Sequence, residues 1–361
     1  MPRPSQFSID LDALAHNVDA LSRLAGSRQK MAVVKANAYG HGAVACARAL
    51  EMSVDAFAVA ITEEAIELRD AGIDKPILVL QGPHSSDDLD IISAHSLWPA
   101  VSNHHQLTWL IAQTNKPDQV WLKVDTGMHR LGFDPDDVAD ARSALHTAGI
   151  LDTTLMSHLA DAEDAASALT HRQAARWDEV LKVQNDWVEG DKQASFSNSA
   201  STVGELFPAE SWVRLGYSLY GGSLINLPAG LQLRPVMTFT SKVAATRWIE
   251  PGETVGYGGR WVAQKRSRIA TIPVGYGDGY PRAAADGTPI GTPYGTVPLA
   301  GKVSMDMITA DVTDIPNIDF GTEVTLWGGT PSVDEVASHC DTIGYELCTR
   351  ITGRTPRRFS R

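Results

Sequence analysis

The sequence predicts an α/β protein with an N-terminal (β/α)8 barrel of the TIM type and a mainly β C-terminal domain. Short apolar runs alternate with amphipathic segments between residues 11 and 216, and this alternation favours a barrel of parallel strands over an open sheet. From about Leu233 onward, β-type runs follow one another across glycine turns without long helices between them. We therefore expect two domains, residues 1–232 and residues 233–361.

Each expected barrel strand is a short apolar run, and a first helical pattern over residues 11–26 precedes them. The runs cover residues 31–35, 56–60, 77–80, 97–101, 121–124, 154–159, 194–197 and 212–216. Amphipathic helices separate most of them. In one of these helices Thr62 is the expected N-cap and Gly72 the expected C-cap, and in another Pro135 falls in the first turn.

The second domain consists of β-type runs and closes with two short helical patterns. The runs cover residues 236–249, 268–274, 295–304, 307–313 and 322–329, and the helical patterns cover residues 332–340 and 345–351.

Composition excludes several classes of function. The net charge of −12 opposes binding to nucleic acid, because no basic block compensates for it except the short C-terminal tail. No apolar run is long enough for a membrane span or a secretory leader, so we expect a cytoplasmic protein without membrane contact. The three cysteines suggest neither a disulfide framework nor a metal site.

Polar and charged residues gather at the ends of the expected barrel strands. They are Lys35, Lys123, His158, Asn198, Ser199 and Arg214. Because a barrel brings the carboxyl ends of its strands to one face, residues spread over the chain become neighbours there. Any one of them alone is more often solvated or structural, so it is the combination that indicates a site.

The loops after the last two expected strands read FSNSAS and RLGYSLYGG. Loops at these positions commonly hold a phosphate with backbone N–H groups, and Asn198, Ser199, Gly216 and Tyr217 fit that role. A phosphate opposite a strand-end lysine suggests pyridoxal 5'-phosphate, whose aldehyde condenses with a lysine amine.

The stretch AVVKANAYGHG supplies the expected lysine. Lys35 ends a buried run just ahead of a helical pattern, which places it at the carboxyl end of a strand. Tyr39 would then reach the phosphate, and Gly40 and Gly42 would leave room for the cofactor.

From end to end the chain resembles the alanine racemases. The motifs that carry this resemblance are VVKANAYGHG, KVDTGMHRLGF, SHLA, FSNSAS, RLG, VGYGGRW, VGYGDGYPR, GKVSMDM and GYELCTR. The resemblance implies a barrel that carries pyridoxal phosphate, a β domain, and a head-to-tail homodimer with shared active sites. It also implies interconversion of L-alanine and D-alanine, either to provide D-alanine for peptidoglycan or for alanine catabolism.

Racemisation needs a base on each face of the substrate Cα. The resemblance implies Lys35 for the D-isomer and Tyr257 of the other subunit for the L-isomer. A phenol is a weak base at neutral pH, and the resemblance implies that His158 and Arg214 support it. Arg214 would also face the pyridine nitrogen of the cofactor, to which a guanidinium donates a hydrogen bond without giving up its proton.

Further roles around the substrate follow from the same resemblance. Arg130 would lie near the substrate carboxylate and the phenolic oxygen of the cofactor. Lys123 aligns with a lysine that is carbamylated in many members and orients this arginine. In the second domain, the implied residues are Met305, Asp306 and Tyr345, which crowd the substrate and the cofactor, and Tyr276 in the outer channel. The aromatic residues Tyr280, Trp261 and Trp327 are expected in the core or an interface.

Three other functions share part of this pattern. A racemase of broader specificity would keep Lys35 and Tyr257 and differ in the width of its pocket. A pyridoxal phosphate-dependent decarboxylase with a similar barrel and β domain would lack the tyrosine base. A barrel-only protein that binds the cofactor would end near the barrel, whereas this chain continues for about 130 residues.

Overall fold

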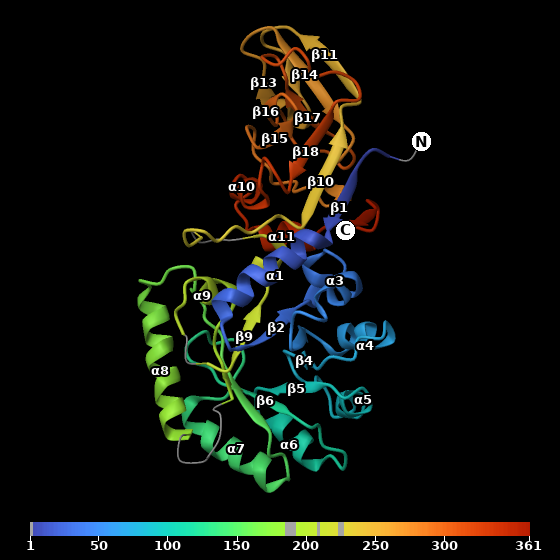
Figure 1. The fold of residues 1–361 in the computed structure, drawn as a ribbon. Coiled ribbons are helices and arrows are strands. Elements are labelled where there is room, and N and C mark those ends of the chain that lie inside the picture. The colour runs from blue at the N-terminus through green and yellow to red at the C-terminus, as the bar shows by residue number, and fades with distance from the viewer. Residues whose placement is uncertain (1–2, 185–192, 208–209, 223–226) are drawn as a thin grey trace.

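The computed structural model describes residues 3–184, 193–207, 210–222 and 227–361. Eight parallel strands form a ring in the N-terminal part, which confirms the predicted barrel (Figure 1). In chain order they are β2 (Gln29–Val33), β3 (Ala56–Val59), β4 (Ile77–Val79), β5 (Trp98–Val101), β6 (Val120–Lys123), β7 (Thr153–Met156), β8 (Ala194–Ser195) and β9 (Trp212–Leu215). All eight overlap the predicted runs.

The ring closes between β8 and β9. Each strand pairs with its neighbour in the order β8-β7-β6-β5-β4-β3-β2-β9. Ser211 N donates to the carbonyl oxygen of Ala194 at 3.2 Å, and Arg214 N donates to that of Ser197 at 3.1 Å. Because the strands are all parallel, their carboxyl ends face the same opening of the ring.

Helices surround the ring. They are α1 (Leu11–Ala25), α3 (Ala43–Leu50), α4 (Thr62–Asp70), α5 (Asp88–Ala94), α6 (His104–Ala112), α7 (Val138–Thr147), α8 (Ala168–Gln184) and α9 (Ser199–Val203), with the short helical turns α2 (Lys35–Tyr39), η1 (Pro135–Asp137) and η3 (Tyr217–Tyr220). Among the described residues, no helix combines the length and apolar character needed to cross a membrane.

The first turns of η1 and α4 can be compared with the helix ends expected from the sequence. Pro135 stands in the first turn of η1, as predicted. The expected N-cap at Thr62 is wrong, because α4 begins at Thr62 and Ile61 is the N-cap without a side-chain hydrogen bond. The carboxylate of Glu64 instead accepts the backbone N–H of Ala60 at 2.7 Å, just ahead of the helix. Gly72 lies one residue beyond the observed C-cap.

The C-terminal part is mainly β, as predicted. Its strands are β10 (Met237–Lys242), β11 (Ala245–Ile249), β12 (Thr254–Val255), β13 (Trp261–Val262), β14 (Ser267–Ile272), β15 (Pro289–Thr292), β16 (Gly295–Pro298), β17 (Ile308–Asp311), β18 (Glu323–Trp327) and β19 (Arg357–Ser360). Its helices are α10 (Val333–Ser338) and α11 (Gly344–Thr349), with the turns η4 (Tyr257–Gly259) and η5 (Tyr276–Asp278). Figure 1 shows α11 between these strands and the barrel.

The first strand of the chain belongs to the second sheet. Strand β1 (Gln6–Asp10) pairs with β10 and β19 in the sheet of order β16-β15-β18-β10-β1-β19. Phe7 on β1 stacks on Phe239 with 4.1 Å between ring centroids, and both rings are buried beside Trp327. We keep the division near residue 233 as a proposal, with β1 as a part of the second sheet.

Candidate active site

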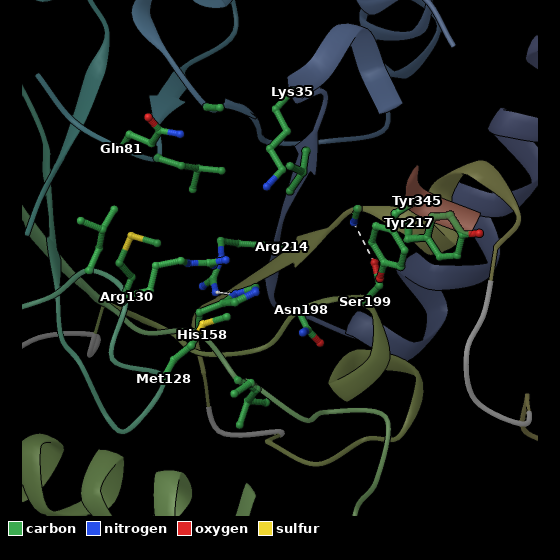
Figure 2. Close-up of a pocket in the computed structure, with 18 of the residues that line it drawn as sticks. Lys35, Gln81, Met128, Arg130, His158, Asn198, Ser199, Arg214, Tyr217 and Tyr345 are labelled. Atoms are coloured by element: carbon green, nitrogen blue, oxygen red, sulfur yellow. Dashed lines mark hydrogen bonds between the residues drawn. The ribbon is translucent and has the colours of Figure 1, made fainter. Parts of the chain in front are cut away.

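A cavity of about 470 Å³ opens at the carboxyl ends of the barrel strands. The residues predicted from the sequence that line it are Lys35, Tyr39, Lys123, Arg130, His158, Asn198, Ser199, Arg214, Gly216, Tyr217 and Tyr345. Figure 2 shows Lys35 and Arg214 pointing into the cavity, with Arg130 on one side and Ser199 and Tyr217 on the other.

Lys35 is followed by a left-handed turn. The four residues Ala36–Tyr39 have φ angles of 51 to 55°, although none of them is glycine. Such a conformation costs about 1–2 kcal/mol per residue, so contacts elsewhere must hold it. Glu64 accepts the N–H of Ala36 at 2.6 Å, and the Asn37 side chain accepts the N–H of Ala43 at 2.7 Å. The turn aims Lys35 and Tyr39 into the same cavity.

His41 supports the turn from within the core. Burial lowers the pKa of its imidazole to about 4, so the ring is neutral at physiological pH. Its Nδ1 lies 3.0 Å from the carbonyl oxygens of Ala38 and Tyr39, an arrangement that requires Nδ1 to carry the hydrogen.

Gly40 and Gly42 do not make room for the cofactor. A Cβ on Gly40 would lie 2.0 Å from the carbonyl oxygen of Cys348 in α11, and one on Gly42 would lie 2.8 Å from the ring of Phe359 in β19. Neither glycine lines the cavity. They let the C-terminal segments approach the turn, where Arg357 Nε donates to the carbonyl oxygen of Gly40 at 2.7 Å.

The two lysines of the cavity are desolvated. Burial is the main cause that lowers the pKa of Lys35, and Arg130 and Arg214 add to it, whereas Glu64 opposes it. Burial and the same two arginines lower the pKa of Lys123 to about 8. A larger share of each amine is therefore neutral, which is the nucleophilic form.

Arg214 and His158 form a pair at the base of the cavity. Arg214 Nη1 donates to Ser195 Oγ at 2.6 Å, and Nη2 donates to the carbonyl oxygen of Ser157 at 2.6 Å. His158 Nδ1 lies 3.4 Å from Nη2. Burial lowers the pKa of Arg214 to about 10, so the guanidinium stays charged at neutral pH.

His158 is neutral in this environment. Burial, together with the cations Arg214 and Arg130, lowers the pKa of its imidazole to about 3. Because its Nδ1 faces a donor, the hydrogen of the ring is on Nε2.

The wall opposite Arg130 is formed by Ser199, Gly216 and Tyr217. Ser199 Oγ accepts the N–H of Gly216 at 2.8 Å, and a Cβ on Gly216 would lie 2.8 Å from the hydroxyl oxygen of Tyr39. Only glycine therefore allows this close approach. Tyr345 stacks on Tyr217 with 3.8 Å between ring centroids and closes the wall.

Four residues predicted for the site lie outside this cavity. They are Tyr257, Tyr276, Met305 and Asp306, all on the β-rich part of the chain. The side chain of Tyr257 is 73% exposed, and Asp306 forms an ion pair with Arg354. Within one subunit the structure does not bring these residues to Lys35.

Some residues that line the cavity were not predicted. Gln81 follows β4 and faces Lys35 across the cavity, and its place directly after the run ILVL could have identified it. Glu163 lies in the loop after β7, and only the folded loop places it at the cavity. Tyr280 and Trp327 are buried as expected, whereas Trp261 is partly exposed.

Fold and site together define a class of protein: an α/β-barrel enzyme in which a desolvated strand-end lysine and a buried guanidinium share one cavity at the carboxyl ends of the strands. Two family models match the chain, "Alanine racemase, N-terminal domain" over residues 9–224 and "Alanine racemase, C-terminal domain" over residues 236–359. The chain therefore belongs to the alanine racemase family, a family of isomerases. The match to the second half excludes a barrel-only protein.

Individual relatives agree with this assignment. The chain is 44% identical to the alanine racemase of Chromohalobacter salexigens over 364 residues, which cover 99% of this chain and 98% of that protein. Among solved structures, the biosynthetic alanine racemase of Pseudomonas aeruginosa superimposes with a TM-score of 0.92 at 39% identity, covering 99% of this chain and 100% of the other. The structure from Acinetobacter baumannii has the same TM-score at 34% identity and the same coverage.

Proposed function

We propose that this protein interconverts L-alanine and D-alanine, with pyridoxal 5'-phosphate as its cofactor and alanine as its substrate. The observation that carries the proposal is the position of Lys35, a desolvated amine beside Arg214 and across from the wall of Ser199 and Gly216. Such an amine is suited to bind an aldehyde carbon and to exchange a proton at neutral pH.

The charges of the cavity fit an anionic cofactor and an amino acid. Its lining contains four cationic side chains, Lys35, Lys123, Arg130 and Arg214, and one carboxylate, Glu163. The wall at Gly216, which a Cβ would fill, would hold the phosphate together with Tyr39, Asn198, Ser199, Tyr217 and Tyr345. When bound, pyridoxal 5'-phosphate supplies an electron sink for charge that develops at the substrate Cα.

Two residues would each carry out one of the two proton transfers at the substrate Cα. Lys35 would exchange the proton on one face of Cα, and Tyr257 of the partner subunit would do so on the other. His158 would donate its Nε2 hydrogen to the phenolic oxygen, because its Nδ1 faces Arg214 at 3.4 Å. With its pKa of about 10, Arg214 would stay charged at neutral pH and would donate a hydrogen bond to the ring nitrogen of the cofactor, and Arg130 would bind the substrate carboxylate.

A shared site requires a homodimer. Tyr257, Tyr276 and Met305 are exposed in a single subunit, and they are the residues that the family resemblance assigns to the site. We propose that they complete the cavity of a second copy. The cytoplasmic location and the use of D-alanine, for peptidoglycan or in catabolism, stay predictions.

The function is tested by incubating the purified protein with each alanine enantiomer and separating the products on a chiral column. Parallel reactions with L-serine, L-lysine and L-arginine test the alternative of a broader racemase. We expect alanine to turn over fastest. Faster turnover of a large basic amino acid would favour the broader racemase, and release of CO2 would favour a decarboxylase.

The cofactor assignment predicts a covalent link at Lys35. Borohydride reduction of the protein loaded with pyridoxal 5'-phosphate is expected to attach the cofactor to the peptide that contains Lys35, because its desolvated amine points into the cavity. Peptide mass mapping measures this. Lys116, whose amine donates to three backbone carbonyls, serves as an internal control and should stay unlabelled. Labelling elsewhere, or none, would contradict the assignment.

We also propose that CO2 adds to the amine of Lys123 with release of a proton, which would place a carboxylate next to Arg130. The lowered pKa of about 8 makes the amine available, because its neutral fraction grows as the pH rises through that value. With 13C-bicarbonate, we expect one carbamate NMR signal at pH 8 that weakens toward pH 6. Lys123→Arg should abolish the signal and Lys116→Arg should retain it. A signal that survives Lys123→Arg would overturn the proposal.

A further inference from the structure

Arg3, near the start of the chain, holds together two loops of the β-rich part. Its Nη1 donates to Asp278 Oδ1 at 2.6 Å, and its Nη2 donates to the carbonyl oxygen of Asp306 at 2.8 Å. Arg354 contacts the same two residues, with its Nε 3.5 Å from Asp278 Oδ1 and its Nη2 in an ion pair with the Asp306 carboxylate. We call these four residues the Arg3 cluster.

Asp278 is the centre of the cluster. Its side chain has no exposed surface, and a buried carboxylate is unfavourable unless it is paired and hydrogen-bonded. Gly275 N donates to Oδ2 at 2.9 Å, and Thr355 Oγ1 donates to Oδ1 at 3.2 Å. Arg3 is the nearer of its two cationic partners, at 2.6 Å compared with 3.5 Å for Arg354.

The cluster joins the loop of Tyr276 to the loop of Met305. Tyr276 N donates to the carbonyl oxygen of Ser304 at 3.1 Å. Gly277 N donates to the carbonyl oxygen of Met305 at 2.9 Å. The two loops therefore form one unit, and it exposes the side chains of Tyr276 (38%) and Met305 (52%).

We propose that Arg3 is a positioning residue for the active site of the partner subunit: it fixes the two loops whose Tyr276 and Met305 narrow the partner's substrate channel. This inference rests on the proposed homodimer with shared sites. Arg3 touches no reacting atom, and Lys35 belongs to the barrel, so loss of Arg3 should weaken substrate binding and leave the proton transfers in place.

The first test compares Arg3→Gln with the unmodified enzyme. We expect the KM for L-alanine to rise about tenfold, because Tyr276 and Met305 are then no longer held at the channel, with kcat and dimer mass nearly unchanged. Arg3→Lys, which keeps the charge, should recover part of the loss. Arg358→Gln is the matched control, because Arg358 is exposed on β19 and its side chain has no hydrogen bond or ion pair with another described residue. A KM unchanged by Arg3→Gln, or changed equally by Arg358→Gln, would overturn the proposal.

A second test asks which subunit needs Arg3. In a mixed dimer of a Lys35→Ala subunit and a Tyr257→Phe subunit, the one intact site takes its tyrosine and its two loops from the Lys35→Ala subunit. Arg3→Gln added to that subunit should raise the KM, and the same change in the other subunit should not. A merely stabilising role would give equal effects from either subunit and would overturn the inference.

The outcome also separates the inference from the proposed function. If the enzyme is active and its KM is the same whichever subunit carries Arg3→Gln, only the positioning role is overturned. An unmodified enzyme that does not racemise alanine overturns both.

Discussion

Tyr257→Phe is expected to retain the bound cofactor and to lose most of the exchange of the L-alanine Cα proton with solvent deuterium. The cofactor would stay because its proposed ligands lie in the barrel cavity, whereas Tyr257 is 73% exposed on the β-rich part of the same chain. Removal of one catalytic base typically lowers a rate by about 10²–10⁴. Proton NMR of L-alanine in D2O measures the exchange directly, and the visible absorbance of the protein reports the cofactor.

Tyr294→Phe is the matched control for this experiment. Tyr294 is also an exposed tyrosine of the β-rich part, in the hairpin between β15 and β16, and the proposed mechanism gives it no role. The Tyr294→Phe variant should exchange the L-alanine Cα proton at the rate of the unmodified enzyme. If Tyr257→Phe exchanges the Cα proton at the unmodified rate, the assignment of two bases is refuted.

Mixed dimers of Lys35→Ala and Tyr257→Phe subunits are expected to regain one intact active site. Each variant alone should be nearly inactive, because every site of its homodimer lacks one of the two bases. In the mixed dimer, the Tyr257→Phe subunit supplies Lys35 and the Lys35→Ala subunit supplies Tyr257 to the same site. Racemisation by mixtures of the two variants, compared with each variant alone, measures the recovery.

A second mixture controls for incidental stabilisation. A mixed dimer of Lys35→Ala and His158→Ala subunits should recover no racemisation. Both residues line the barrel cavity of their own subunit, so each of the two sites lacks one of them. Heterodimer formation is verified by purification through two different affinity tags. Verified Lys35→Ala and Tyr257→Phe heterodimers without activity would argue for sites built within one subunit.

The barrel side of the site could be predicted because it depends on a regular geometry. Parallel strands place their carboxyl ends at one opening. Residues at the ends of the predicted strands, such as Lys35, His158 and Arg214, are therefore expected to be neighbours, and all three line the cavity. The same criterion would have found Gln81, which directly follows the run ILVL. The roles of Tyr257 and Met305 came only from family resemblance, because no local pattern links an exposed β-domain residue to a cavity in another subunit.

The left-handed turn after Lys35 could not be predicted from its own residues. Hydrophobic spacing carries no information about the sign of φ, and the sequence suggested room for a cofactor at Gly40 and Gly42. The turn is held by Glu64 from α4 and Arg357 from β19, which are distant along the chain. These non-local hydrogen bonds offset the conformational free energy that the left-handed turn costs, so the turn forms only in the folded molecule.

The sequence by itself determined the alternation of strands and helices, the barrel, and the set of polar residues at its mouth, because apolar periodicity is a local property and helices between successive strands imply a parallel sheet. Only the tertiary structure decided that β1 joins the second sheet and that Arg3 reaches Asp278. Partners separated by more than 200 residues leave no periodic signal, and the burial of Asp278 beside Arg3 depends on surroundings that only the complete fold creates.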